Sequence, residues 1–369
     1  MKKIDLKEYK DFKQYFGFYD VIIKRVSSNK DVFLESLYLS PSSYRRAKNT
    51  GNKIGKQILN DLCKHFNYKM INDLIVDEIE EKINSIYYSV YYKNYDTYED
   101  DLFWLESMLE KRYIIYPVLL LFKLLLLINS HIKPNNIIKN SKDIYEELQQ
   151  FELFFNDDLL EIYEVIKVSF VNEINNNVLA YNYKNELSYF TLSSKCILSQ
   201  RYIEGIHFSE KAKNIFIREE NFLRVYYANL NIMASYNLLH KYDECFALAQ
   251  KQLLSLKAHK ILEFEYNATL RHYLASCLGL GRYNNIINSL NEKEHLNKTE
   301  AICFLVAKYK INKNEYTKYM DLLKSNMSQE EDNFLDLINS LLVDNNKKVI
   351  SLLESMKITK SVIEILKKM

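Results

Sequence analysis

The chain has 369 residues, of which 27% are charged and 48% hydrophobic, and its formal net charge at pH 7 is +2. This length is enough for two or three domains with a sizeable buried core. Only 6 glycines and 3 prolines occur, too few turn-forming residues for a β or α/β protein of this length, so we expect an all-α fold.

The charge is unevenly distributed along the chain. Residues 1–68 contain 14 Lys and Arg against 7 Asp and Glu, a balance of +7, so the remainder carries −5. A basic N-terminal region on an acidic body indicates a polyanionic partner for that region alone. The alternative is an uneven surface that is simply solvated.

A helix-start signal lies within the basic region. Ser40 is a suitable N-cap, because its hydroxyl can accept a bond from a free backbone N–H. Pro41 suits the first helical position, where its missing N–H costs nothing. Together they predict a short helix over 42–49 that is closed by Gly51.

Two further helices are expected beside this one. The stretch 31–39 indicates a preceding helix with Phe33, Leu34 and Leu37 inward, and the stretch 54–66 is amphipathic with an apolar residue at every fourth position. Helix, tight turn, basic helix and supporting helix form the helix-turn-helix arrangement, whose second helix enters the major groove of DNA.

The short basic helix has an inward and an outward side. Tyr44 and Ala47 are three residues apart and are expected to face inward. The polar and basic residues that remain for the groove and the phosphates of double-stranded DNA are Ser42, Ser43, Arg45, Arg46 and Lys48, to which we add Lys53. The alternative is an ordinary surface helix with solvated Arg and Lys side chains.

The stretch resembles the helix-turn-helix of the XRE/Cro–repressor type, whose core reads Leu-x-Ile-Ser-x-Ser-x-Ile-Ser-Arg. The matching residues here are Leu37, Leu39, Ser40, Ser42, Tyr44, Arg45 and Arg46. The resemblance implies that Pro41, Ser42 and Arg45 lie where bases are contacted. It also implies that Arg46 lies where a phosphate is held.

Two positions depart from that pattern. Leu34 stands where a small residue is usual, and Tyr38 stands at the position of the turn glycine. A tight turn favours glycine because glycine adopts a left-handed backbone conformation without steric cost. We expect this DNA-binding domain to cover residues 1–69.

The most apolar segment is 114–128. It is 15 residues long and contains Lys123, whereas a membrane span needs roughly 20 apolar residues. We therefore expect a buried core helix rather than a membrane span, with Pro117 near its start or kinking it.

The cysteines give no sign of a metal or redox pair. The chain has 5 of them, and the closest two are 26 residues apart. An odd number without a signal peptide fits a reducing cytoplasm, which is the expected location. Cys196, Cys245 and Cys277 lie among apolar helical positions and are expected to be small core residues.

One pattern recurs from about residue 180 onward. Tyr202, Tyr242 and Tyr283 are spaced by 40 and 41 residues, and each follows one amphipathic helix and begins another. Weaker copies cover 314–323 and 346–353. Such spacing is typical of helical hairpins of the tetratricopeptide kind, which stack because each has an apolar face that it cannot bury alone. We expect residues 70–369 to form a right-handed superhelix of such hairpins.

A helix-turn-helix followed by tetratricopeptide-like repeats resembles the RRNPP group, the peptide-pheromone receptors of Gram-positive bacteria and their phages, to which the phage arbitrium receptors are related. The resemblance implies a homodimeric quorum-sensing transcription regulator that binds operator DNA. It also implies that a short signalling peptide binds in the concave groove of the repeats and switches the protein.

The resemblance also implies a peptide site. In this family an Asn on a groove-lining helix holds the peptide backbone, and Asn231 falls at the matching place, with Met233 for a usual Gly and Cys245 for a usual Ala. An Asn amide both donates and accepts, so it can pair with an extended backbone. The alternative for Asn231 is a surface or inter-repeat hydrogen bond.

Other residues of the same helix face and of the next hairpin complete the expected peptide site. Arg271 has the chemistry to pair with a peptide carboxylate, whereas His272 is more often a structural residue on such a helix. The residues expected to join Asn231 are Arg224, Tyr227, Ser235, Asn267, Arg271 and His272.

Catalytic motifs are not found. The 7 histidines form no HExxH or other metal-ligand spacing, and no Gly-rich nucleophile elbow occurs. We therefore expect no enzyme activity, no metal and no cofactor. A second hypothesis keeps the repeats but not the DNA: a scaffold of tetratricopeptide-like hairpins that binds a protein partner.

Overall fold

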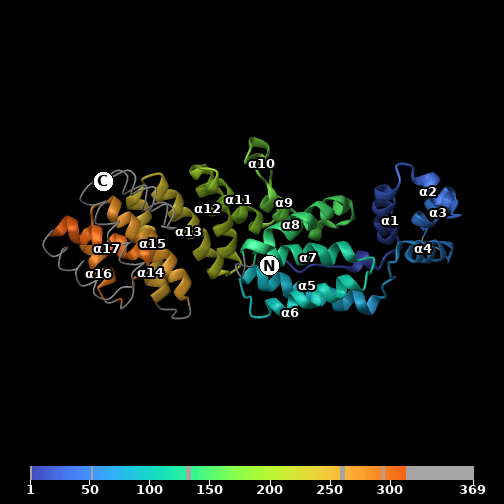
Figure 1. Ribbon diagram of the computed structural model, residues 1–369, viewed down its shortest axis with the longest axis horizontal. Coiled ribbons are helices and arrows are strands. Elements are labelled where there is room, and N and C mark those ends of the chain that lie inside the picture. The colour runs from blue at the N-terminus through green and yellow to red at the C-terminus, as the bar shows by residue number, and fades with distance from the viewer. Residues whose placement is uncertain are drawn as a thin grey trace. The chain divides into compact units, whose positions relative to one another are not determined.

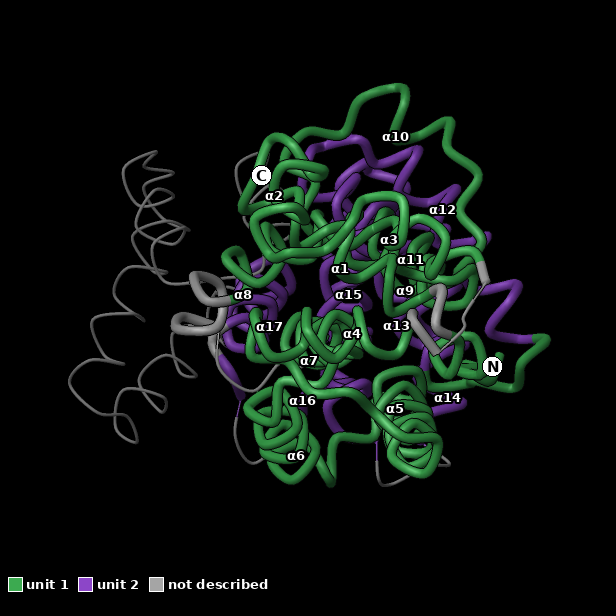
Figure 2. Tube along the Cα trace, turned by 90° about the vertical axis from the view of Figure 1, so that its right-hand side faces the viewer, with its two compact units in different colours: residues 1–192, 218–223 green, residues 193–217, 224–369 purple. Residues whose placement is uncertain are grey.

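The computed structural model describes residues 2–50, 53–129, 134–257, 262–291, 293 and 296–312. Most of these residues lie in helices (Figure 1), which confirms the predicted all-α fold. The chain divides into two compact units, residues 1–192 with 218–223, and residues 193–217 with those from 224 onward (Figure 2). None of the described helices is long and apolar enough to cross a membrane. The boundary predicted after residue 69 stays a prediction.

The first unit begins with the basic region and continues into a helical body. The helices of the basic region are η1 (Lys7–Lys10), α1 (Phe12–Val26), α2 (Lys30–Ser36), α3 (Pro41–Thr50) and α4 (Lys53–Phe66). Those of the body are α5 (Asp73–Tyr92), α6 (Tyr98–Glu110), α7 (Tyr116–Asn129), α8 (Pro134–Leu148), η2 (Gln149–Phe154), α9 (Asp157–Phe170) and α10 (Asn176–Ala180).

A tight turn joins α2 to α3. The helix predicted over 31–39 ends earlier, at Ser36, because Tyr38 adopts a left-handed conformation with φ of 60°. The N–H of Leu39 then donates to the carbonyl of Leu34 at 2.9 Å, which closes the helix end. As predicted, Pro41 is the first residue of α3, and the N–H of Ser43 donates to the Ser40 hydroxyl at 3.4 Å.

The predicted inward side of α3 is confirmed. Tyr44 and Ala47 are buried, with exposed fractions of 0% and 1%, and the Tyr44 ring meets Phe16 of α1 edge-on at 5.0 Å between ring centroids. Leu34 of α2 is also buried, while Phe33 is partly covered and stacks on Phe66 of α4. The side opposite Tyr44 therefore faces outward.

Helix α7 forms the centre of the body. It runs from Tyr116, so Pro117 occupies its first turn, where the missing N–H breaks no helical bond. Ten of its apolar and proline side chains are buried, and α5, α6, α8 and α9 all pack against it (Figure 1). Lys123 is only partly buried, and its ammonium forms an ion pair with Glu106 of α6 at 2.8 Å. The prediction of a buried core helix is confirmed.

The described part of the second unit consists of three helical hairpins and one further helix. Helix α11 (Glu186–Leu198) begins in the first unit and ends in the second. The remaining helices are α12 (Tyr202–Arg218), α13 (Phe222–Leu238), α14 (Tyr242–Lys257), α15 (Glu263–Gly279), α16 (Tyr283–Leu290) and α17 (Lys298–Ile311).

The hairpin connections are alike at the level of single backbone bonds. The second helix of each hairpin begins at Tyr202, Tyr242 and Tyr283, as the 40- and 41-residue spacing predicts. Two residues earlier the backbone is left-handed each time, with φ of 62°, 60° and 66°. The intervening N–H donates to the carbonyl five residues before it at 2.8 Å in all three turns. This repetition confirms the hairpins, while the superhelix and its handedness stay predictions.

The interior of the second unit follows the same repeat. Gly205, Cys245 and Ile286, three residues after each repeat tyrosine, are all buried. Cys196 and Cys277 are fully buried as well, so the expectation of small core cysteines is confirmed. The weaker copies over 314–323 and 346–353 lie outside the described residues, as does Gly51.

Candidate nucleic-acid and peptide sites

The outward side of α3 carries the residues predicted to contact DNA. Ser42, Arg45 and Arg46 are exposed, whereas Pro41 and Ser43 are partly buried. The Arg45 side chain is 65% exposed and forms an ion pair with Asp31 of α2. An exposed ion pair of this kind contributes only about 0–1 kcal/mol, so little free energy is needed to break it. The side chain of Lys53 lies outside the described residues.

Lys48 is held differently from the two arginines. Its ammonium donates to Asp20 of α1 at 2.6 Å, and Asp20 also pairs with Lys30 of α2. The hydroxyl of the buried Tyr44 donates to the same carboxylate at 2.7 Å. Asp20 therefore joins α1, α2 and α3, and it neutralises part of the charge that the sequence analysis assigned to DNA contact at Lys48.

The protonation states at this junction follow from burial and charge. Burial alone would raise the pKa of Asp20, but hydrogen bonds from Lys30, Lys48 and Tyr44 outweigh it and leave that pKa below the ordinary value. Burial and the nearby Asp20 charge raise the pKa of Tyr44, which keeps its hydroxyl a donor. The junction is therefore ionised at Asp20 and neutral at Tyr44 around neutral pH.

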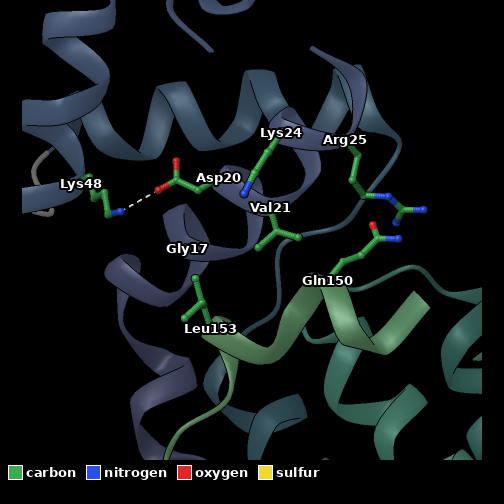
Figure 3. Close-up of a pocket in the computed structure, with 8 residues that line it drawn as sticks. All are labelled: Gly17, Asp20, Val21, Lys24, Arg25, Lys48, Gln150 and Leu153. Atoms are coloured by element: carbon green, nitrogen blue, oxygen red, sulfur yellow. Dashed lines mark hydrogen bonds and ion pairs between the residues drawn. The ribbon is translucent and has the colours of Figure 1, made fainter. Parts of the chain in front are cut away.

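A pocket of about 500 Å³ opens beside this junction. Figure 3 shows Lys24 and Arg25 of α1 and Lys48 of α3 on its wall, with Asp20 bonded to Lys48. Leu153 of η2 contributes an apolar side chain to the same wall. Asp20 pairs with Lys48, and Arg25 lies 3.7 Å from Glu147, so two of the three cations on this wall have acidic partners.

The residues predicted for the peptide site do not share one environment. Arg224 and Ser235 of α13 are buried, with exposed fractions of 1% and 0%, so they do not present a surface to a peptide. This corrects the expectation for both residues. The reason is that packing inside the unit covers these two side chains, whereas Tyr227 and Asn231 on the same helix are only partly buried.

Asn231 is partly buried and uses its amide within the protein. Its Nδ2 donates to the hydroxyls of Ser193 and Ser194 on α11, at 3.2 and 3.0 Å. These bonds join consecutive hairpins, which is the alternative that the sequence left open for this residue. Both bonds use Nδ2, so the natural acceptor for a peptide N–H at this residue is Oδ1.

Two further interactions link α13 to α15. The Tyr227 hydroxyl donates to the buried Glu265 carboxylate at 2.6 Å, and Asn237 donates to the His272 carbonyl at 3.2 Å. Burial, reinforced by the charge of Arg271, lowers the pKa of His272 to about 4, so its ring is neutral around pH 7.

The remaining two candidates lie on α15. Asn267 is partly buried and accepts a bond from Lys293 at 3.1 Å, while Arg271 is partly buried beside His272. Asn231, Tyr227, Arg271 and His272 thus provide amide, hydroxyl, cationic and aromatic groups on two consecutive first helices. Such a set suits the backbone and the carboxylate of a short peptide.

The sequence did not single out Glu265, Ser193 or Asn237. Glu265 and Asn237 lie on helices, where the spacing of apolar residues predicts which side is buried but not which groups a polar side chain will bond to. The signal that was available is the polar residue itself, because a buried Glu or Asn must find a hydrogen-bond partner. Among the described residues, no three His, Cys, Asp or Glu side chains gather in a way that could hold a metal ion.

Comparison with protein-family models, with curated proteins and with solved structures found no match for this chain. The functional conclusions below therefore depend on the residues and interactions already described.

Proposed function

We propose that this chain is a DNA-binding transcription regulator whose repeat region responds to a short peptide. The observation that carries the proposal is the two-sided character of α3: Tyr44 and Ala47 are buried, while Ser42, Arg45 and Arg46 are exposed. A tight turn precedes this helix, and no acidic residue occurs from Tyr38 to Lys56. Hydroxyl and guanidinium groups at the start of an exposed helix are suited to base edges and phosphates.

The proposal includes a homodimer that places two copies of α3 about 34 Å apart, one turn of duplex DNA, on a palindromic operator. A peptide bound near Tyr227, Asn231, Arg271 and His272 would then shift the populations of dimers that are competent to bind. A ligand shifts such an equilibrium only by its difference in affinity between the two states.

The test begins with selection of duplexes from a random pool by the full-length protein. Binding of the selected duplex is measured by fluorescence anisotropy over a range of salt concentrations. Arg45→Ala combined with Arg46→Ala should weaken binding tenfold or more and reduce the steepness of its salt dependence, by about 0.9 for each phosphate that the protein no longer neutralises. Lys251→Ala combined with Lys257→Ala removes two exposed cations from α14 and is the matched control.

Retention of binding by the α3 variant, or an equal decrease in the α14 control, would refute the assignment of α3 to DNA binding.

Peptide binding is tested separately with a library of short synthetic peptides and a thermal-shift assay. Asn231→Ala should abolish the shift of any hit, while Asn284→Ala, an exposed Asn on α16, should leave it unchanged. The mass of the free protein by light scattering tests the dimer.

The second candidate is a scaffold that binds a protein partner without DNA. The observation that favours it is the engagement of Lys48 by Asp20 and of Arg45 by Asp31, which lowers the net charge presented by α3. Failure to select any duplex from the pool, together with capture of a folded protein partner by the repeats, would favour the scaffold.

A further inference from the structure

The N-terminal residues 2–6, here called the strap, lie against two helices of the body without secondary structure of their own. Ile4 and Leu6 are buried, with exposed fractions of 2% and 0%. The strap is therefore an ordered part of the first unit.

Side chains of the body bind the backbone of the strap at Ile4, Asp5 and Leu6, and the Leu6 carbonyl also accepts from the Tyr9 N–H at 2.9 Å. Asn84 of α5 makes a two-bond pair with Ile4: the Ile4 N–H donates to Oδ1 at 2.8 Å, and Nδ2 donates to the Ile4 carbonyl at 2.9 Å. The Leu6 N–H donates to Glu80 of the same helix at 2.8 Å. A side-chain amide that bonds to both the N–H and the carbonyl of one residue binds the peptide backbone whatever the side chain of that residue.

The residue between them is bound from the opposite helix. The Asp5 N–H donates to Asp158 of α9 at 3.3 Å, and its carbonyl accepts from Nδ2 of Asn156, the N-cap of α9, at 3.0 Å. Successive residues thus bond to α5, α9 and α5 in turn, so the segment lies between two walls until its backbone turns into η1 at Leu6, where φ is −106° and ψ is 13°. We call Glu80, Asn84, Asn156 and Asp158 the strap seat.

The charges around the strap are complementary. The Lys2 ammonium lies 2.6 Å from Asp158 and 3.3 Å from Glu161, and Lys3 lies 3.8 Å from Glu80. The seat therefore recognises two basic residues, then two aliphatic side chains separated by one residue. This is the pattern by which receptors bind extended peptides: backbone bonds supply affinity, and alternate side chains supply specificity.

We propose that the strap seat is a peptide-binding site that residues 2–6 of the same chain fill as a tethered ligand. Its second occupant is an extended peptide segment with the pattern basic, basic, aliphatic, any residue, aliphatic. A tethered segment acts at an effective concentration of about millimolar. An incoming segment must therefore be present above that level or bind more tightly than the strap.

A second anchor, at Tyr9, separates the strap from the basic region. The strap continues through η1, where the buried Tyr9 hydroxyl donates to the Phe154 carbonyl at 2.9 Å and accepts from the Asn156 N–H at 3.0 Å. Helix α1 begins at Phe12, directly after this anchor. Tyr9 lies outside residues 2–6, so these two bonds do not depend on the strap and α1 keeps its anchor when a competing peptide binds.

The experiment uses the full chain with Ile4→Asp and Leu6→Asp, which eject the strap and leave every residue of the seat unchanged. The probe is a synthetic peptide, Lys-Lys-Ile-Asp-Leu-Lys, with a fluorophore at its C-terminus. The variant should bind it at least tenfold more tightly than the unmodified chain does. Adding Asn84→Ala should weaken that binding about tenfold, because two backbone bonds are removed. Adding Asn60→Ala, an exposed Asn on α4, should not change it.

A variant that keeps its circular dichroism and melting transition but does not bind the peptide would overturn the proposal. If the variant does not fold, hydrogen exchange on the unmodified chain decides instead. Peptide above about millimolar should speed exchange of the strap amides, since it competes with the tethered segment. Unchanged exchange at that concentration contradicts the proposal. A peptide with Ile and Leu made adjacent is the control in both assays. Either failure leaves the assignment of α3 to DNA untouched.

Discussion

Gly279, the last residue of α15, gives the sharpest test of how the hairpins pack. A Cβ added there would lie 2.5 to 2.6 Å from three ring atoms of Tyr242, the first residue of α14. Carbon atoms prefer separations of roughly 3.5–4.0 Å, so the ring would have to move by about 1 Å. Glycine is thus required here by the close approach of a repeat tyrosine.

Two effects of Gly279→Ala oppose each other. Ala is favoured over Gly in a helix by up to about 1 kcal/mol, and by less at the last residue. Overpacking of a filled site costs about 1–3 kcal/mol. The ring of Tyr242 is only partly buried and can pivot, which places the cost toward the lower end. We expect a net decrease of about 0.5–2 kcal/mol in the free energy of unfolding.

Urea denaturation followed by circular dichroism measures this decrease. In a Tyr242→Ala background the clash is absent, so Gly279→Ala should change sign and stabilise by up to about 1 kcal/mol. Gly17→Ala in α1 is the matched control, because the nearest atom to its added Cβ is Gln14 Oε1 at 4.0 Å. Equal stability of Gly279→Ala and the unmodified chain, with Tyr242 present, would refute the packing argument.

Three further predictions concern single residues. Tyr38→Gly should stabilise the basic region by about 1 kcal/mol in urea denaturation, because Tyr38 has φ of 60°; a destabilised variant would mean that the Tyr38 ring makes a needed interaction. Asp20→Asn should cost roughly 1–3 kcal/mol at pH 7. The folded pKa of Asp20 is lowered, so its contribution is complete above about pH 4 and is lost as pH falls through the folded pKa; an unchanged acid limb in melts of Asp20→Asn would contradict this. His272 has a folded pKa of about 4, below its usual value of about 6.5, so the unfolded chain binds a proton more readily than the folded chain. The free energy of unfolding should therefore decrease as the pH is lowered from about 6.5 to about 4, and urea denaturation should show this decrease in the unmodified chain but not in His272→Gln.

The helices and their inward sides could be predicted from local pattern. Tyr44 and Ala47 are buried as their spacing on α3 indicates, and the repeat tyrosines begin three helices at the predicted residues. These features depend on neighbours three or four residues apart and on capping groups, so a single stretch of sequence contains the information. The early end of α2 is the exception, since a Tyr in the left-handed region is uncommon.

The partners of the polar side chains could not be predicted in the same way. Asp20 meets Lys48 and Tyr44, and Asn231 meets Ser193, across sequence separations that no local pattern encodes. Arg224 is buried because of how its helix packs in the folded chain. Its residue type alone would predict the opposite, since arginine is mostly exposed in proteins.

From its residues alone, then, the chain determines an all-α fold, a basic region with a two-sided helix, and hairpins with a fixed spacing. These depend on backbone propensity and on the period of apolar side chains. Tertiary structure alone decides which cations of α3 remain exposed, which polar groups are buried and where the N-terminal strap lies. Those outcomes depend on which elements meet, because a buried donor or charge takes whatever partner the packing brings within hydrogen-bond distance.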